Sequence, residues 1–278
     1  VHVLPDLNMD TTDRNRTSPF AFTGNKFEFR SLGSAISIAC PNIMLNTIVA
    51  EELRQFAEFL EGPGELAPRV TELVRKVVTA HKRIIFNGDG YSPEWVEEAK
   101  RRGLLNLPTT VDALPRYLDQ KNIELFARHK IYTEAEMEAR YETIMEEYVK
   151  TLHIEALTMI GMVRQEVLPA VSRYVQGLAE AVNAKRQAVS SLPCRAEAAL
   201  IEKLSGQMDK AFELVEYLDE KLGNPRSRSV NILSAATYYR DVLVPAMEDL
   251  RGAVDAMEMH VSAECWPYPT YADLMFRV

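Results

Sequence analysis

Three long amphipathic segments in the second half of the chain constrain its fold more than any other feature. Apolar residues recur there near a period of 3.6, over residues 134–182, 195–222 and 230–263. Short polar turns join the segments, and Gly223-Asn224-Pro225 ends the second one. Each segment needs a partner for its apolar face. We therefore expect residues 134–278 to form a long antiparallel helical bundle or coiled-coil-like extension.

Two local signals refine the first of these helices. Thr133 and Glu136 have the spacing of a capping box, which predicts a helix beginning at about residue 134. Pro169 lies inside the same periodic run. Because proline removes a backbone donor and clashes with the preceding turn, we expect an interruption near Gln165.

The first 133 residues have a mixed pattern. Two apolar-aromatic runs, 19–22 and 26–30, flank a Gly-Asn turn and predict a β-hairpin. Helical periodicity follows over 41–61 and 67–81, and Ser92 followed by proline begins a shorter helix. The sequence thus predicts an α+β fragment, mostly α, in which short antiparallel strands plus helices precede the helical extension.

Composition excludes several classes of protein. The chain has 278 residues, 47% of them hydrophobic, which is enough for one large domain or two modest ones. Its net charge of -8 argues against a nucleic-acid partner. The longest apolar runs are too short for a membrane span, and the three cysteines are far apart. We expect a cytoplasmic protein with free thiols, no nucleic acid and no membrane contact.

Charged residues are densest in and before the predicted hairpin. Strict alternation places Lys26, Glu28 and Arg30 on one face of the second strand, and Arg14 and Arg16 precede the first strand. A glutamate can hold a divalent cation, and arginines can grip phosphate oxygens in bidentate fashion. That combination suits phosphoryl transfer. From these residues alone, a solvated polar strand face remains an alternative.

The segment DRNRTSPFAFTGNKFEFR, residues 13–30, resembles the signature near the end of the catalytic domain of glutamine synthetases. The matching positions are Asn15-Arg16-Thr17 and Glu28-Phe29-Arg30. The details resemble the type III branch. The resemblance continues through residues 87–104, 109–115, 121–126 and 266–274, so it covers essentially the whole chain.

The resemblance implies a role for each matched position. Glu28 would be a metal ligand for Mg²⁺ or Mn²⁺, Arg30 would contact the transferred phosphoryl group, and Arg16 would bind phosphate or nucleotide. ATP, glutamate and ammonia would be the reactants, with γ-glutamyl phosphate as the intermediate. Residues 1–133 would be the C-terminal part of the catalytic domain, and residues 134–278 a helical C-terminal extension. The resemblance also implies a ring-shaped homo-oligomer.

The sequence departs from the family pattern at one position. Other branches carry an arginine five residues after Arg16, where this chain has Ala21, and Arg14 is a weak candidate to replace it. The other metal ligands of the family are expected upstream of Val1, in a missing N-terminal part of the same chain. The five histidines here are interpreted as structural or solvent-exposed. We therefore expect this fragment to be inactive alone.

Two other functions stay open at this point. The chain could be a non-catalytic helical oligomerisation or interaction module that retains part of a catalytic domain. It could also belong to a related ligase that joins glutamate to a different amine, because Ala21 leaves the substrate contacts incompletely assigned.

Overall fold

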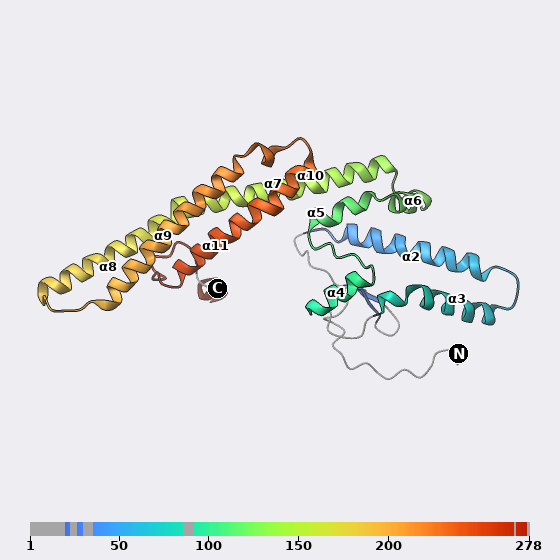
Figure 1. Ribbon diagram of the computed structural model, residues 1–278, viewed down its shortest axis with the longest axis horizontal. Helices are drawn as coiled ribbons and strands as arrows, with labels where there is room; N and C mark the ends of the chain where they lie inside the picture. Colours follow the sequence, from blue (N-terminus) through green and yellow to red (C-terminus); the bar gives the residue numbers. More distant parts are fainter. Residues whose placement is uncertain (1–19, 23–26, 30–35, 86–91, 270, 277–278) are drawn as a thin grey trace, which may run out of the picture. The chain divides into compact units, whose positions relative to one another are not determined.

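The computed structural model describes residues 20–22, 27–29, 36–85, 92–269 and 271–276. Contacts divide the chain into two compact units, Val1–Met137 and Glu138–Val278, named unit 1 and unit 2 below. Most of the described residues are helical, several of them in long helices (Figure 1). This confirms the mostly helical character that the sequence predicts.

Unit 1 combines one small hairpin with a series of helices. Its elements in chain order are β1 (Phe20–Phe22), β2 (Phe27–Phe29), α2 (Ala39–Leu60), α3 (Leu66–His81), the 3-10 helix η1 (Lys82–Ile84), α4 (Pro93–Arg101), α5 (Thr110–Ala113), the 3-10 helix η2 (Leu114–Leu118) and α6 (Gln120–Arg128). The two strands are antiparallel, as the sequence predicts. Helices α2 and α3 form a helical hairpin (Figure 1).

Local sequence explains where these helices begin and end. Gly64 adopts a φ of 113° in the turn between α2 and α3, a conformation open to few residues other than glycine. At the start of α4, the Ser92 side chain accepts a hydrogen bond from the Trp95 backbone N–H, and Pro93 occupies the first turn. Gly103, with a φ of 71°, follows the end of α4. The predicted cap at Ser92 is confirmed.

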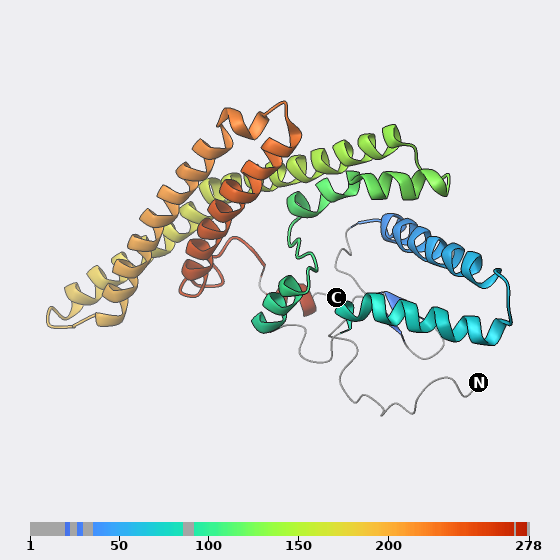
Figure 2. The same cartoon turned by 45° about the vertical axis from the view of Figure 1, so that its right-hand side comes forward.

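Unit 2 consists of long helices with few interruptions. Its elements are α7 (Glu134–Met162, whose first turn belongs to unit 1), the π-helix η3 (Val163–Val167), α8 (Leu168–Ala188), α9 (Arg195–Leu222), the 3-10 helix η4 (Pro225–Arg228), α10 (Ile232–Tyr238), the π-helix η5 (Tyr239–Leu243), α11 (Val244–Glu258) and α12 (Tyr271–Phe276). Helix α9 lies alongside both α8 and α11 (Figure 2).

Two π-helical turns interrupt these long helices, each just before a proline. In η3 the Leu168 N–H donates to the Val163 carbonyl, five residues back, and Pro169 follows. In η5 the Val244 N–H donates to the Tyr239 carbonyl in the same way, directly ahead of a second proline. A proline cannot donate and clashes with the carbonyl four residues earlier, so a wider turn accommodates it.

The first interruption confirms the break expected near Gln165. The second corrects a prediction, because residues 230–263 were expected to form one continuous helix. Pro245 is the physical reason for the difference: it divides that segment into α10, η5 and α11.

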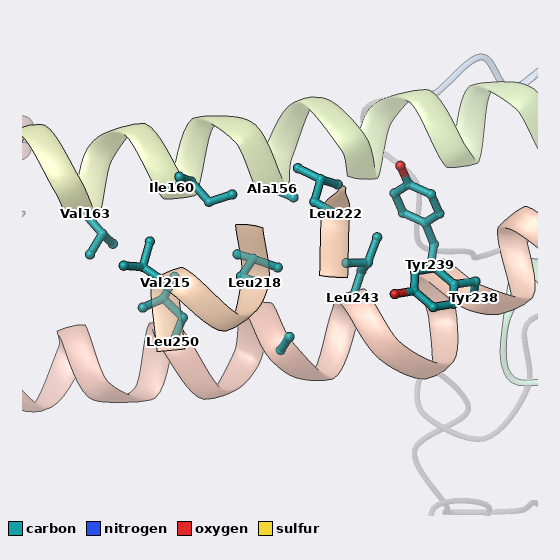
Figure 3. Close-up of a cluster of buried hydrophobic side chains, with 11 residues drawn as sticks. Ala156, Ile160, Val163, Val215, Leu218, Leu222, Tyr238, Tyr239, Leu243 and Leu250 are labelled. Atoms are coloured by element: carbon teal, nitrogen blue, oxygen red, sulfur yellow. The ribbon is translucent and has the colours of Figure 1, made fainter. Parts of the chain in front are cut away.

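The core of unit 2 consists of two neighbouring apolar clusters. The first draws on α7, α9, η5 and α11, and Figure 3 shows its side chains meeting between these helices. Leu218, Leu243 and Leu250 are all 0% exposed there. The second cluster extends the core toward Trp266, whose ring packs against residues of η3, α8, α9 and α11. Trp266, which is 9% exposed, therefore lies in the core.

Candidate functional site

The predicted catalytic hairpin contributes one described residue to the candidate site. Cα pairing places Glu28 in β2 opposite Ala21 in β1, with Phe20 opposite Phe29 and Phe22 opposite Phe27. The predicted hairpin is thus present. Arg14, Arg16, Lys26 and Arg30 lie outside the described residues. The roles assigned to Glu28, Arg16 and Arg30 therefore remain predictions, and so does the role of Ala21.

A metal site cannot be completed from the described side chains alone. Among the residues that the structure describes, no three histidine, cysteine, aspartate or glutamate side chains gather closely enough to hold a metal ion. A glutamate such as Glu28 is of the residue type whose oxygen Mg²⁺ and Mn²⁺ prefer as a ligand. That residue type fits a divalent cation as one ligand of several.

A cluster of charged and polar side chains in unit 1 surrounds Glu51 of α2. Glu51 is 7% exposed. Its carboxylate accepts hydrogen bonds from Arg54 at 2.8 and 3.0 Å and from Arg128 at 2.6 Å. His129 Nε2 lies 2.8 Å from it, and Gln55 Nε2 donates at 3.0 Å. The cluster joins α2 to the end of α6.

This environment fixes the ionisation state of Glu51. The hydrogen bond from Arg54 contributes most to holding the pKa of Glu51 well below its usual range, followed by the contact with His129. A carboxylate with such a low pKa is a poor proton acceptor. Glu51 therefore serves to hold two helices together, and nothing in its geometry gives it a catalytic role.

Sequence reasoning did not identify the Glu51 cluster. Arg128 and His129 are more than 70 positions away from Glu51 in the chain. The sequence offered only the helical spacing of Thr47 and Glu51, four positions apart, and the structure shows that these two are the buried residues of α2.

His153 of α7 has structural surroundings. His153 Nδ1 lies 2.9 Å from the hydroxyl of Tyr239, a residue that is 1% exposed. Figure 3 shows this hydroxyl directed toward α7. The contact satisfies a buried phenol in the core of unit 2. His2 lies outside the described residues.

Unit 2 has an apolar groove between α7 and α11, with a volume of about 580 Å³. Met159, Val167, Val254, Trp266 and Tyr268 are among the residues that line it. Burial raises the pKa of Tyr268 to about 12, with a further contribution from the charge of Glu166. The groove has the size of a small-ligand site, and its lining also includes the charged residues Glu155, Arg251, Asp255 and Glu258. No helix in the described part of the chain is both long and apolar enough to cross a bilayer.

Comparisons with known proteins place this geometry in context. The family model described as "Glutamine synthetase C-terminal domain" matches residues 69–186. The type-3 glutamine synthetase of Dictyostelium discoideum is 37% identical over 279 residues, which cover 98% of this chain and 38% of that relative. A glutamine synthetase of Butyrivibrio fibrisolvens is 36% identical over 277 residues, which cover 97% of this chain and 38% of the relative.

A third relative gives the same picture. The glutamine synthetase of Bacteroides fragilis (strain YCH46) is 32% identical over 284 residues, or 98% of this chain. The chain spans 38% of the length of each of these relatives. The similarity thus includes both units and corresponds to the C-terminal portion of type III glutamine synthetases.

Proposed function

The chain belongs to the type III glutamine synthetase family, and from this premise we propose that it is part of an ATP-dependent ligase that joins ammonia to glutamate. The observation that carries the proposal is 37% identity over 98% of the chain, a match that includes the hairpin bearing Glu28. Because the chain spans 38% of that relative, the activity belongs to a longer protein. The 278 residues alone are inactive in this proposal.

Glu28 acts in this proposal as one ligand of a divalent cation, Mg²⁺ or Mn²⁺. A carboxylate oxygen suits either ion, and the bound ion would offset the negative charge on the phosphates of ATP. Arg16 and Arg30 donate hydrogen bonds to phosphate oxygens, because a guanidinium matches the geometry of a phosphoryl group. Arg30 contacts the phosphoryl group that is transferred, and Arg16 contacts phosphate or nucleotide.

The reaction consists of two displacements. An oxygen of the glutamate side-chain carboxylate attacks the γ-phosphorus of ATP, and ADP leaves, which gives γ-glutamyl phosphate. The nitrogen of ammonia then attacks the acyl carbon. Phosphate leaves, the nitrogen loses a proton, and glutamine is the product. Positioning and charge neutralisation provide most of the catalysis in transfers of this type.

The partners of this chain follow from the same proposal. The rest of the natural chain supplies the remaining metal ligands, and copies of the protein assemble into a cytoplasmic ring-shaped homo-oligomer. The surface of α3 supports the need for a partner. Leu66, Val70, Val74 and Val78, named here the α3 apolar stripe, are spaced four residues apart and are between 37% and 63% exposed. An apolar stripe of this kind is suited to burial against further protein.

The decisive experiment measures phosphate release from MgATP, glutamate and ammonia by the full-length protein and two variants. Glu28→Gln keeps the side-chain volume but removes the charge that binds the metal. We expect it to reduce kcat by at least about a hundredfold, because a metal ligand is lost. Glu72→Gln is the matched control. Glu72 is an exposed residue of α3, and its substitution is expected to leave kcat unchanged.

Three outcomes would change the proposal. Activity with another amine, in the absence of activity with ammonia, would move the protein to a related ligase. Equal activity of wild type and Glu28→Gln would keep the family but remove the hairpin from the site. An inactive full-length protein would favour the non-catalytic helical interaction module. The core and apolar groove of unit 2 give that alternative a specific basis.

A further inference from the structure

A second group of basic side chains lies in unit 1, away from the hairpin. It surrounds a hollow of about 760 Å³ formed by the end of α3, η1 and α4. Lys82 and Arg83 come from η1, and Arg101 and Arg102 come from the end of α4. Glu98 is the one carboxylate among the lining residues. This basic pocket is a local reversal of charge, because the whole chain has a net charge of -8.

Glu98 neutralises part of the pocket, on the α4 side. It forms ion pairs with Arg101 and Arg102, and the hydrogen bonds from Arg102 and then Arg101 hold the pKa of Glu98 below its ordinary value. The Glu98 carboxylate is thus ionised, and each of its two oxygens pairs with one of these arginines. Within the described residues, Glu98 forms no ion pair with the basic side chains of η1.

Arg102 holds the walls of the pocket together. Its Nη1 donates hydrogen bonds to the backbone carbonyl of Ile85 at 2.8 Å and to that of Arg83 at 3.3 Å. Its guanidinium also lies over the Trp95 ring, 5.6 Å from the centroid. These contacts fix α4 against the segment after η1. Arg102 is therefore a positioning residue, and it keeps Lys82 and Arg83 facing the hollow.

The positive charges of Lys82 and Arg83 are not neutralised by any described side chain. Within the described residues neither side chain forms a hydrogen bond or an ion pair. Two adjacent cations repel each other, which is tolerable in water and becomes favourable when an anion lies between them. Val78 and Ile85 line the same hollow with apolar surface. The pocket thus joins a cationic wall to an apolar wall.

We propose that the basic pocket binds a phosphate-bearing anion, with Lys82 and Arg83 as its principal ligands and Arg101 in support. The guanidinium of Arg83 offers paired donors that match phosphate oxygens, and the Lys82 ammonium adds a point charge. Ile85, which also lines the hollow, contacts any organic portion of the ligand. The volume is in the range of small-molecule sites, so a nucleoside diphosphate fits as well as pyrophosphate.

This inference does not depend on the proposed ligase reaction. The basic pocket belongs to α3, η1 and α4, whereas the proposed metal ligand belongs to β2. A catalytically inactive Glu28→Gln protein therefore retains the pocket. This separation allows the two proposals to fail independently of each other.

The test is isothermal titration calorimetry of the full-length Glu28→Gln protein with pyrophosphate. EDTA is present so that no divalent metal supports binding at the proposed catalytic site. The test variant is Lys82→Gln/Arg83→Gln. The control is Arg75→Gln/Lys100→Gln, which removes the same charge from exposed positions of α3 and α4 outside the pocket lining. We expect the test variant to weaken binding by at least about tenfold and the control by less than about twofold.

The possible results separate clearly. Equal weakening by both double variants would mean that only general charge attracts the anion, and it would overturn the proposal. The same conclusion follows if the protein with an intact pocket does not bind pyrophosphate, for example because another part of the natural chain covers the hollow. A parallel titration with ADP identifies the source of the phosphate. Tighter binding of ADP supports a nucleotide ligand, and equal binding supports an inorganic one.

Discussion

Unit 2 packs its apolar residues into two clusters, whereas unit 1 leaves many of its apolar residues exposed. Residues such as Leu218, Leu243 and Leu250 are 0% exposed in unit 2. In the described part of unit 1, the buried hydrophobic residues are Val111, Phe126 and Met137. Helices α3 and α4 contain no buried residue.

This difference in apolar burial means that the two units are stabilised by different interactions. Unit 2 has long helices that bury their apolar faces against one another, so hydrophobic burial stabilises it from within. Unit 1 relies more on polar contacts, chiefly the Glu51 cluster between α2 and α6. A unit with little core of its own is suited to completion by further chain, which agrees with a sequence spanning 38% of its relatives.

Matched leucine substitutions test this comparison most strongly. Leu250→Ala removes a side chain that is 0% exposed in α11, and Leu53→Ala removes one that is 59% exposed in α2. We expect Leu250→Ala to lower the free energy of unfolding by about 2–5 kcal/mol, because it leaves a cavity. Leu53→Ala should change it by less than about 0.5 kcal/mol. Urea unfolding followed by circular dichroism measures both.

The same pair of variants also tests whether unit 1 is completed by further chain. If a larger loss appears for Leu53→Ala in the full-length protein than in the 278-residue chain, then additional protein covers α2. Equal small losses in both would show that this face of unit 1 stays in water.

The pH dependence of unit 1 provides the second test. The pKa of Glu51 is held well below its ordinary 4.5, mainly by Arg54. A carboxyl whose pKa is depressed on folding stabilises the protein above its unfolded pKa, and this stabilisation disappears as the pH falls. We expect the protection of α2 and α6 amides against hydrogen exchange, relative to their intrinsic rates at each pH, to decrease below about pH 4.5.

Substitution of Glu51 separates this effect from general acid unfolding. In the Glu51→Gln variant, the amides of α2 and α6 should exchange faster at pH 7, because Arg54 and Arg128 lose their carboxylate. The protection of these amides should also depend less on pH. Glu146→Gln in α7 removes an exposed ion pair with Lys150, and its exchange should match that of wild type. An unchanged profile for Glu51→Gln would show that the cluster does not stabilise unit 1.

The capping box at the start of α7 predicts a smaller effect. The Thr133 side chain accepts from the Glu136 N–H at 3.3 Å, and the Glu136 carboxylate accepts from the Thr133 N–H at 2.8 Å. We expect Thr133→Ala to cost about 1 kcal/mol in thermal unfolding. Thr143→Ala, in the middle of the same helix, is the matched control. It should be neutral or slightly stabilising, because alanine is the better helix former.

The smallest expected effect concerns Tyr268, which lines the apolar groove in unit 2. Burial raises its pKa to about 12. A tyrosine whose pKa is raised on folding stabilises the protein fully below about pH 10, and this contribution is lost as the pH rises through 12. Tyrosine ionisation is followed by ultraviolet absorbance as the pH rises. The ionisation step at the highest pH should be absent from Tyr268→Phe and present in Tyr217→Phe. Tyr217 is the control because it is 45% exposed.

Most of the helices could be predicted because their signals are local. The predicted helix over residues 195–222 coincides with α9, whose core residues Leu204, Val215 and Leu218 repeat at helical spacing. Thr133 and Ser92 mark helix starts through contacts with residues three positions further on. The break caused by Pro245 was missed because the apolar period continues across it, and the π-turn keeps Leu243 and Ala246 buried on either side.

The sequence by itself determined the family, the hairpin that carries Glu28 and the order of the helices, since these depend on neighbouring residues and on motifs. Only the tertiary structure decided which distant side chains meet. Arg128 is 77 positions from Glu51, and Arg102 is 19 positions from Arg83. Helical periodicity shows which face of a helix is apolar, but it does not show where the chain returns after a loop. Contacts between distant segments, including the basic pocket, therefore follow from packing alone.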